Sequence, residues 1–210
     1  MNKKEELQKI REEVSVCVKC PLFKTRTNTV FGEGDENAEV LFVGEAPGEN
    51  EDKQGIPFCG AAGKFLDEML GRIGLNRSDV YIANTLKCRP PGNRDPEDVE
   101  KEFCKPYLDK QFEIISPLLI VCLGRHSTAT FLPGAGGITN LHGKPVKRPN
   151  GQVYRPLYHP AAALHNGGLR QTLIDDFMKI PAILEKIKSM RDKKGGNEGN
   201  EDKRKQLKLI

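Results

Sequence analysis

The sequence has no tryptophan, only 6% aromatic residues, and no apolar run near the roughly 18 residues that cross a membrane. Its six cysteines are unevenly spaced among 210 residues and are too few for a disulfide scaffold. The first residues carry charge with no apolar segment after it, which is unlike a secretory signal. We therefore expect a cytoplasmic protein without a membrane span.

Most of the chain also has no excess of positive or of negative charge. The net charge is +4, but residues 191–210 alone hold seven Lys and Arg against four Asp and Glu. The preceding residues are nearly neutral, so affinity for nucleic acid would need a local basic surface. We expect one domain over residues 1–190 and a disordered, charged tail over 191–210. The last five residues faintly resemble a sliding-clamp binding peptide, although a solvated end is the simpler interpretation.

Short apolar runs alternate with helical patterns. Strands are predicted at residues 40–43, 80–83, 118–123 and 153–158. Helices are predicted at 2–16, near 65–73, from residue 95 onward, in a short stretch that follows Gly124 and ends at 131, and at 169–189. Pro106 predicts a break just after Cys104, Pro181 a kink, and Asn150-Gly151 a hairpin, whereas residues 44–63 read as a loop. The alternation predicts an α/β fold with helices on both faces of a parallel sheet.

Polar or glycine-rich segments follow three of the predicted strands. They are Gly44–Gly48, Asn84–Arg89 and His159–Ala162. Because ligands bind beyond the carboxyl ends of parallel strands, these segments predict a pocket with a carboxylate, an amide and an imidazole. Taken singly, Glu45 reads as a cap or ion-pair residue, Asn84 as a turn residue and His159 as a structural histidine. His126, His142 and His165 have no comparable placement and are interpreted as surface or structural residues.

The first of these segments matches neither a phosphate-binding P-loop nor the dinucleotide-binding glycine pattern. A phosphate cradle is therefore disfavoured as its main role.

Four cysteines form a candidate metal site. Cys17 and Cys20 are a C-x2-C pair, and Cys88 and Cys104 lie in polar surroundings. Four thiolates suit tetrahedral zinc or an iron–sulfur cluster, and the spacing leaves both open, with a redox pair ranked third. Cys59 and Cys122 are interpreted as packing residues. Basic residues near Cys88 indicate a loop suited to a phosphate backbone, namely Lys87, Arg89 and Arg94.

Three long motifs resemble those of the family 4 uracil-DNA glycosylases, the thermostable iron–sulfur type. They are Gly44–Asp52 with Gly55–Gly63, then Asn84–Arg94, then His159–Ala162. The resemblance covers roughly residues 5–190, and the four cysteines occur in the right order.

This resemblance implies a three-layer α/β/α sandwich on a four-stranded, mainly parallel sheet. It implies a 4Fe-4S cluster on Cys17, Cys20, Cys88 and Cys104, and removal of uracil from single- or double-stranded DNA as the first step of base excision repair. The implied uracil pocket comprises Gly44, Glu45, Ala46, Phe58 for stacking, Asn84 for the base edge and His159 for uracil O2. The partner is uracil-containing DNA, and we expect a monomer.

These roles make chemical sense. The Asn84 amide can accept from uracil N3–H and donate to O4, and cytosine presents the opposite pattern. Glu51 is a weak candidate for excluding the thymine methyl group. His159 would stabilise charge on uracil O2. Ala46 stands where the related family 1 enzymes carry an aspartate, so Glu45 is a hypothetical substitute for the missing base. Leu164 is a candidate wedge in the base stack, with packing as an equal alternative.

Two other functions share some of these residues. One is a non-catalytic, metal-stabilised nucleic-acid-binding domain, which needs the cysteines and the basic loop but no pocket. The other is an enzyme that acts on free nucleotides. Incubation with a uracil-containing oligonucleotide followed by alkali distinguishes a glycosylase from the first alternative. A preference for long DNA over deoxyuridine, with a steep salt dependence, would argue against the second alternative.

Overall fold

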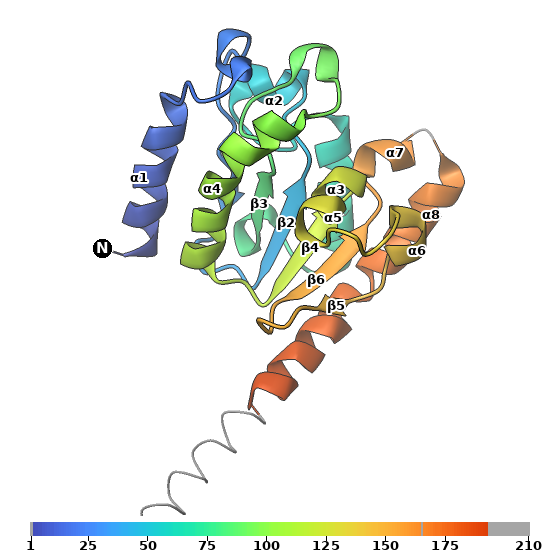
Figure 1. Cartoon of the computed structure of the whole chain (residues 1–210). Coiled ribbons are helices and arrows are strands. Elements are labelled where there is room, and N and C mark those ends of the chain that lie inside the picture. The colour runs from blue at the N-terminus through green and yellow to red at the C-terminus, as the bar shows by residue number, and fades with distance from the viewer. Residues whose placement is uncertain (1, 165, 193–210) are drawn as a thin grey trace, which may run out of the picture.

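The apolar runs of the sequence form one mixed sheet, shown in Figure 1. A computed structural model describes residues 2–164 and 166–192. The strand order is β1-β3-β2-β4-β6-β5. The strands are β1 (Glu33–Gly34), β2 (Val40–Gly44), β3 (Tyr81–Asn84), β4 (Leu119–Leu123), β5 (Val146–Lys147) and β6 (Val153–Leu157).

The α/β architecture is confirmed, but the expected count of four strands is wrong. The four central strands pair in parallel, whereas β1 and β5 add antiparallel edges on β3 and β6. Each edge strand has only two residues, so it leaves no alternating pattern in the sequence. The hairpin expected at Asn150-Gly151 is present, and it joins β5 to β6.

Helices connect the strands. They are α1 (Lys3–Ser15), α2 (Glu49–Gln54), α3 (Ala61–Arg72), α4 (Asp98–Ile115), α5 (Arg125–Phe131), α6 (Ile138–Leu141), α7 (Pro160–Leu164) and α8 (Gly167–Phe177). Residues 180–192 are also helical. Short 3-10 turns are η1 (Pro21–Lys24), η2 (Arg77–Asp79) and η3 (Pro91–Asn93). Within the described ranges, none of the helices has the length and apolarity needed to cross a bilayer.

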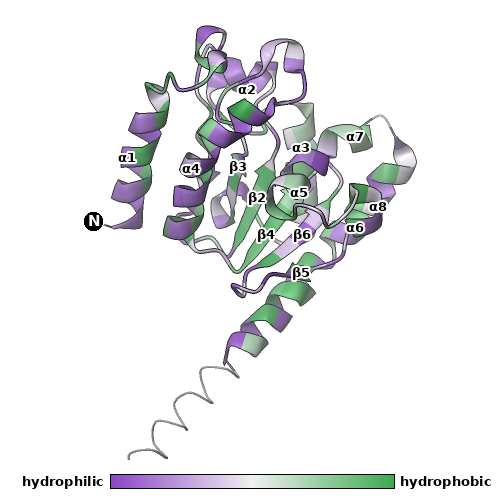
Figure 2. Ribbon diagram, viewed as in Figure 1, coloured by the Kyte–Doolittle hydropathy of each residue, from purple (hydrophilic) through white to green (hydrophobic). Residues whose placement is uncertain are grey.

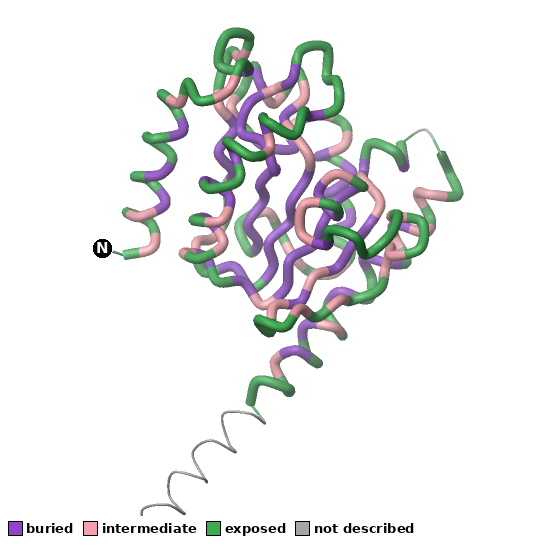
Figure 3. The backbone as a smooth tube through the Cα atoms, viewed as in Figure 1, coloured by how far each residue is buried: buried purple, intermediate pink, exposed green. Residues whose placement is uncertain are grey.

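Both faces of the sheet are covered. Val40 and Phe42 belong to a core with α3, α7, α8 and residues 180–192, whereas Leu41 and Val43 belong to a second core with α1 and α4. This division follows from the two-residue period of a strand. Figure 2 shows the apolar central strands between helices with polar outer surfaces, and Figure 3 shows the buried residues concentrated there.

Pro106 does not break its helix, so the break expected after Cys104 is wrong. Helix α4 runs continuously through this residue. Proline removes the bond to the carbonyl four residues earlier, that of Glu102. Both residues lie on the exposed side of α4, where water can satisfy that carbonyl. Packing of the buried face, which includes Tyr107 and Leu108, outweighs the low helix propensity of proline.

Two other predictions about helices are confirmed, and one prediction of a loop is partly wrong. The first helix is confirmed, with an Asn2 side chain that accepts from the Glu5 amide. The kink near Pro181 is confirmed, because α8 ends at Phe177 and helix resumes at residue 180. The loop expected over residues 44–63 is partly wrong, since it contains α2, whose start is capped by Glu51. The tail and its suggested clamp peptide lie almost entirely outside the described residues.

Candidate active site

The ends of β2 and β3 are locked side by side. Gly44 is the register partner of Asn84, and the Thr85 amide donates to the Gly44 carbonyl at 3.0 Å. The Thr85 hydroxyl donates to the Glu45 carbonyl at 2.5 Å. The two predicted segments therefore open at one edge of the sheet, as the strand-end rule requires.

Gly44 lies directly beneath two predicted site residues. A Cβ added at this position would lie 2.6 Å from Phe58 Cζ and closer still to Asn84 Oδ1. Asn84 itself is only 2% exposed. Its Oδ1 is buried and, among the residues that the structure describes, has no hydrogen-bond partner. A buried acceptor without a donor costs free energy, so this oxygen is well suited to a donor on a ligand.

The backbone around Phe58 is strained and firmly held. Phe58 has φ 51°, a left-handed conformation that a bulky residue rarely adopts. Arg77 Nη2 donates to the Phe58 carbonyl at 2.6 Å, and both Nη atoms donate to the Pro57 carbonyl at 3.0 Å. Gly63 approaches so closely that a Cβ there would overlap the Phe58 carbonyl oxygen. These contacts fix the phenyl ring at the pocket.

His159 follows β6 and faces Phe58. The two ring centroids are 5.6 Å apart. The Ala161 amide donates to His159 Nδ1 at 3.1 Å, so the proton of a neutral ring lies on Nε2. Burial lowers the pKa of His159 to about 4, partly offset by Glu51. The imidazole is therefore neutral near pH 7 and presents Nε2–H as a donor.

These side chains line one pocket of about 340 Å³, which is within the usual size range of small-molecule sites. Its lining includes Glu45, Ala46, Glu51, Phe58, Asn84 and His159. The Glu51 carboxylate accepts from the Gly48 and Gly60 amides at 3.1 and 3.0 Å. It therefore braces the loop around the pocket, which leaves Glu45 as the carboxylate of the lining without a backbone hydrogen bond among the described residues.

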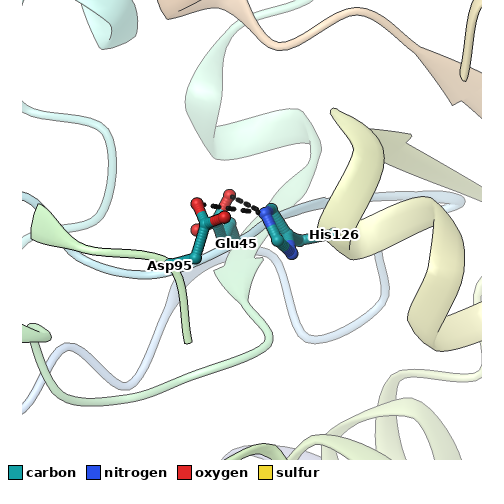
Figure 4. A group of neighbouring side chains, drawn as sticks. All are labelled: Glu45, Asp95 and His126. Carbon is teal, nitrogen blue, oxygen red and sulfur yellow. Dashed lines mark ion pairs between the residues drawn. The ribbon is translucent and has the colours of Figure 1, made fainter. Parts of the chain in front are cut away.

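Two residues beside Glu45 were not predicted as site residues. Figure 4 shows Glu45 and Asp95 side by side, with both carboxylates facing one nitrogen of the His126 ring. His126 Nε2 lies 3.8 Å from Glu45 Oε2 and 3.2 Å from Asp95 Oδ1. Burial raises the pKa of Glu45, while the neighbouring His126 opposes this shift. His126 closely follows β4, so the strand-end rule used for the other three strands would have found it.

The four cysteines predicted as metal ligands line a second, small pocket. Arg26 Nη1 and the Lys87 amide donate to the sulfurs of Cys88 and Cys104 at 3.2 and 3.3 Å. Tetrahedral zinc would hold its sulfurs about 3.8 Å apart. Within the described ranges, no three of these sulfurs lie within 4.8 Å of one another. As placed, the described sulfurs are therefore too far apart to surround one tetrahedral zinc ion.

Lys87 was expected to contact DNA, and this prediction is wrong. Its side chain is 1% exposed, and Nζ donates to the Asn84 carbonyl at 3.0 Å and to Gln111 Oε1 at 2.6 Å. Among the described residues it forms no ion pair with a carboxylate. Burial lowers its pKa to about 8, opposed by the charges of Cys104 and Cys88. Lys87 thus lies between the cysteine pocket and the strand end that carries Asn84.

The other predicted DNA contacts are Arg89, Arg94 and Leu164. Arg94 lines the pocket and binds the fully buried Glu100 through two bonds of 2.6 and 2.9 Å. Arg89 donates to Asn93 Oδ1 at 2.7 Å. Leu164, at the end of α7, is 37% exposed. Of the predicted basic cluster, only the two arginines have side chains within reach of solvent.

The sequence is similar to those of known proteins. The model of the uracil DNA glycosylase superfamily matches residues 31–180. The type-4 uracil-DNA glycosylase of Sulfurisphaera tokodaii is 50% identical over 208 residues, which is 94% of each chain. The chain belongs to the type-4 uracil-DNA glycosylases. Enzymes of that name from Archaeoglobus fulgidus and Thermotoga maritima are 47% and 43% identical, over 87% and 89% of this chain and 95% and 99% of their own.

The similarity to type-4 uracil-DNA glycosylases covers nearly the whole chain. The superfamily match starts after Cys17 and Cys20, whereas the similarity to type-4 relatives extends over most of the chain. The family predicted from the three motifs is thus confirmed.

Proposed function

We propose that this uracil-DNA glycosylase extrudes uracil from DNA into the Phe58–Asn84–His159 pocket and hydrolyses its N-glycosidic bond. The products are free uracil and an abasic site, the first step of base excision repair. One observation carries this assignment: a stacking ring, an orphaned buried amide oxygen and a neutral imidazole donor face one cavity.

Recognition follows from shape and hydrogen bonding. Leaving the duplex costs the base a few kcal/mol, and stacking on Phe58 returns about 1–3 kcal/mol. The unpartnered Asn84 Oδ1 accepts from uracil N3–H, and the amide nitrogen donates to O4. Cytosine offers the reverse pattern and leaves two buried groups unpaired. Glu51, held in place by two backbone amides, is the candidate wall against the thymine methyl group.

His159 supplies the electrophilic part of catalysis. As the C1′–N1 bond breaks, its electron pair moves onto uracil and negative charge grows on O2. The sugar becomes positively charged, as in glycoside hydrolysis. A donor such as Nε2–H, placed at that oxygen, stabilises the transition state by about 3–4 kcal/mol. Because this imidazole is neutral, it acts by hydrogen bonding and retains its proton.

Glu45 supplies the carboxylate that Ala46 cannot. A water oxygen adds to C1′, and its proton passes to Glu45 and then to solvent, from which the departing uracil anion takes up a proton. The same carboxylate would stabilise the positive charge on the sugar. General-base assistance of this kind is worth about 10²–10⁴ in rate.

The four cysteines would hold a 4Fe-4S cluster. Such a cluster can supply electron-transfer chemistry, but the hydrolysis described above needs no redox step. Its role here is structural, because the loop from Asn84 to Arg94 connects the cysteine pocket with the uracil pocket. Lys87 lies between the cysteine pocket and Asn84, and its buried ammonium would place a positive charge beside the thiolates that hold the cluster.

DNA would run across the rim of the pocket. Arg89 and Arg94 are candidates for phosphate contacts, and Leu164 for a wedge. The protein would act in the cytoplasm as a monomer on uracil-containing DNA, with residues 1–190 as one domain. A clamp contact through the tail remains a separate proposal.

A single-uracil oligonucleotide tests this function. The wild-type protein should yield an alkali-labile site at uracil and none at cytosine or thymine. His159→Gln should slow single-turnover cleavage by about 10²–10³ while DNA binding persists. Binding without any cleavage by the wild-type protein would instead support a non-catalytic nucleic-acid-binding domain.

A further inference from the structure

Three separate segments bring charged groups together beside the uracil pocket. Glu45 follows β2, Asp95 precedes α4, and His126 lies in the first turn of α5 (Figure 4). His126 Nε2 lies 3.2 Å from Asp95 Oδ1 and 3.8 Å from Glu45 Oε2. One imidazole nitrogen thus faces two carboxylates, of which only Glu45 lines the pocket.

The inner and outer members of this group differ in exposure. The Glu45 and His126 side chains are 29% and 18% exposed, whereas those of Asp95 and Arg125 are 61% and 67% exposed. Arg125 Nη2 pairs with Asp95 Oδ2 at 2.6 Å, and its Nε lies 3.0 Å from His126 Nε2. One nitrogen of His126 therefore faces both a solvated ion pair and the half-buried carboxylate of the pocket.

A divalent cation does not explain the group. Two carboxylates and an imidazole are suitable ligands, and their atoms lie within 4.8 Å of one another. However, Arg125 already supplies a positive charge beside both Asp95 and His126. The arrangement instead resembles an acid–base residue that is oriented by a second and a third group.

We infer that His126 is a positioning residue that, anchored by Asp95, holds Glu45 ionised and aimed at the attacking water. This inference rests on the role proposed for Glu45 in water activation. It explains how the pocket functions with Ala46 in place of an acidic residue. The base is displaced by one position along the chain, and an imidazole from β4–α5 steadies it from outside the pocket.

The charges facing Glu45 predict two opposite effects on pH dependence. Burial disfavours ionised Glu45, His126 favours it, Asp95 disfavours it, and Arg125 and Lys101 favour it. Glu45 must be ionised to accept a proton, so its titration sets the acidic limb of the rate profile. His126→Gln should move that limb to higher pH, and Asp95→Asn should move it to lower pH. Simple structural damage would not shift the limb in opposite directions.

The test is single-turnover cleavage of a uracil oligonucleotide as a function of pH. It compares the wild type, His126→Gln, Asp95→Asn, Glu45→Gln and the double variant Glu45→Gln/His126→Gln. His126→Gln should slow the step by about tenfold to hundredfold at neutral pH, less than Glu45→Gln, because the base itself remains. In the Glu45→Gln background it should add less than about twofold, since a positioning residue acts through its partner.

A matched control removes another imidazole paired with a carboxylate. His142 Nδ1 lies 2.8 Å from Asp176 Oδ2, and His142 does not line the pocket. His142→Gln should keep the wild-type rate and pH profile at temperatures where it is folded. The KM for DNA should be unchanged in His126→Gln, which distinguishes positioning from a contact with phosphate.

Three results would overturn the inference. If His126→Gln keeps the wild-type rate and pH profile while Glu45→Gln is slow, His126 has no positioning role, although Glu45 still acts as the base. An equal loss in the wild-type and Glu45→Gln backgrounds gives His126 a role independent of Glu45. A normal rate for Glu45→Gln removes the proposed base, and the inference with it, while the uracil specificity assigned to Asn84 stands.

Discussion

Substitution of Gly44 by alanine tests the convergence of the pocket most severely. The new Cβ would lie 2.6 Å from Phe58 Cζ, about 1 Å short of ordinary van der Waals contact, and closer to Asn84 Oδ1. Both side chains must retreat, because Gly44 lies in the central strand β2 and cannot move freely. Displacement by about 1 Å typically costs about 10² in rate, and overpacking costs about 1–3 kcal/mol of stability.

The matched control is Gly71→Ala in helix α3. A Cβ there meets nothing within 4 Å, so the same added methyl should stabilise the helix by up to about 1 kcal/mol and leave cleavage unchanged. Single-turnover cleavage and thermal unfolding are measured for both variants. A folded Gly44→Ala protein that cleaves uracil at the wild-type rate would refute the close packing of Phe58 and Asn84 around the base.

Three further predictions concern groups around the pocket. Because folding lowers the pKa of His159 to about 4, the unfolded chain binds more protons between that value and its ordinary pKa of about 6.5. Acidification through this window should destabilise the wild type, and denaturation of His159→Gln should show a flatter dependence; equal slopes would contradict this. Arg77→Met removes donors to the Pro57 and Phe58 carbonyls and should lower the free energy of unfolding by about 2–3 kcal/mol, as measured by chemical denaturation. Free uracil should also inhibit cleavage by this variant more weakly. Unchanged stability would show that the strained loop needs no such anchor. Lys87→Met should lose the absorption of the proposed 4Fe-4S cluster faster in air yet retain DNA affinity, because the side chain is buried; weaker DNA binding with intact absorption would restore its role as a phosphate contact.

The strand ends were predictable because one rule governs them. Parallel strands place their carboxyl ends at one edge, so Gly44, Asn84 and His159 come together without any knowledge of packing. The same rule applied to residues 118–123 would have included His126. It was missed because a histidine three residues beyond a strand, on a short helix, reads as a surface residue.

Features set by tertiary packing were not predictable. The burial of Lys87 depends on Gln111, 24 positions away, and a basic residue beside two arginines reads as part of a surface. The continuity of α4 through Pro106 depends on which face of the helix is exposed. The role of Arg77 depends on the left-handed backbone of Phe58, which leaves no trace in a sequence where phenylalanine is followed by Cys59 and Gly60.

A crystal structure of the protein with abasic product DNA and free uracil would show directly how the pocket holds the base. We predict that uracil stacks on the Phe58 ring, donates N3–H to Asn84 Oδ1 and accepts from His159 Nε2 through O2. Uracil bound outside the space between these three side chains, or with its N3–H directed away from Asn84, would contradict this prediction.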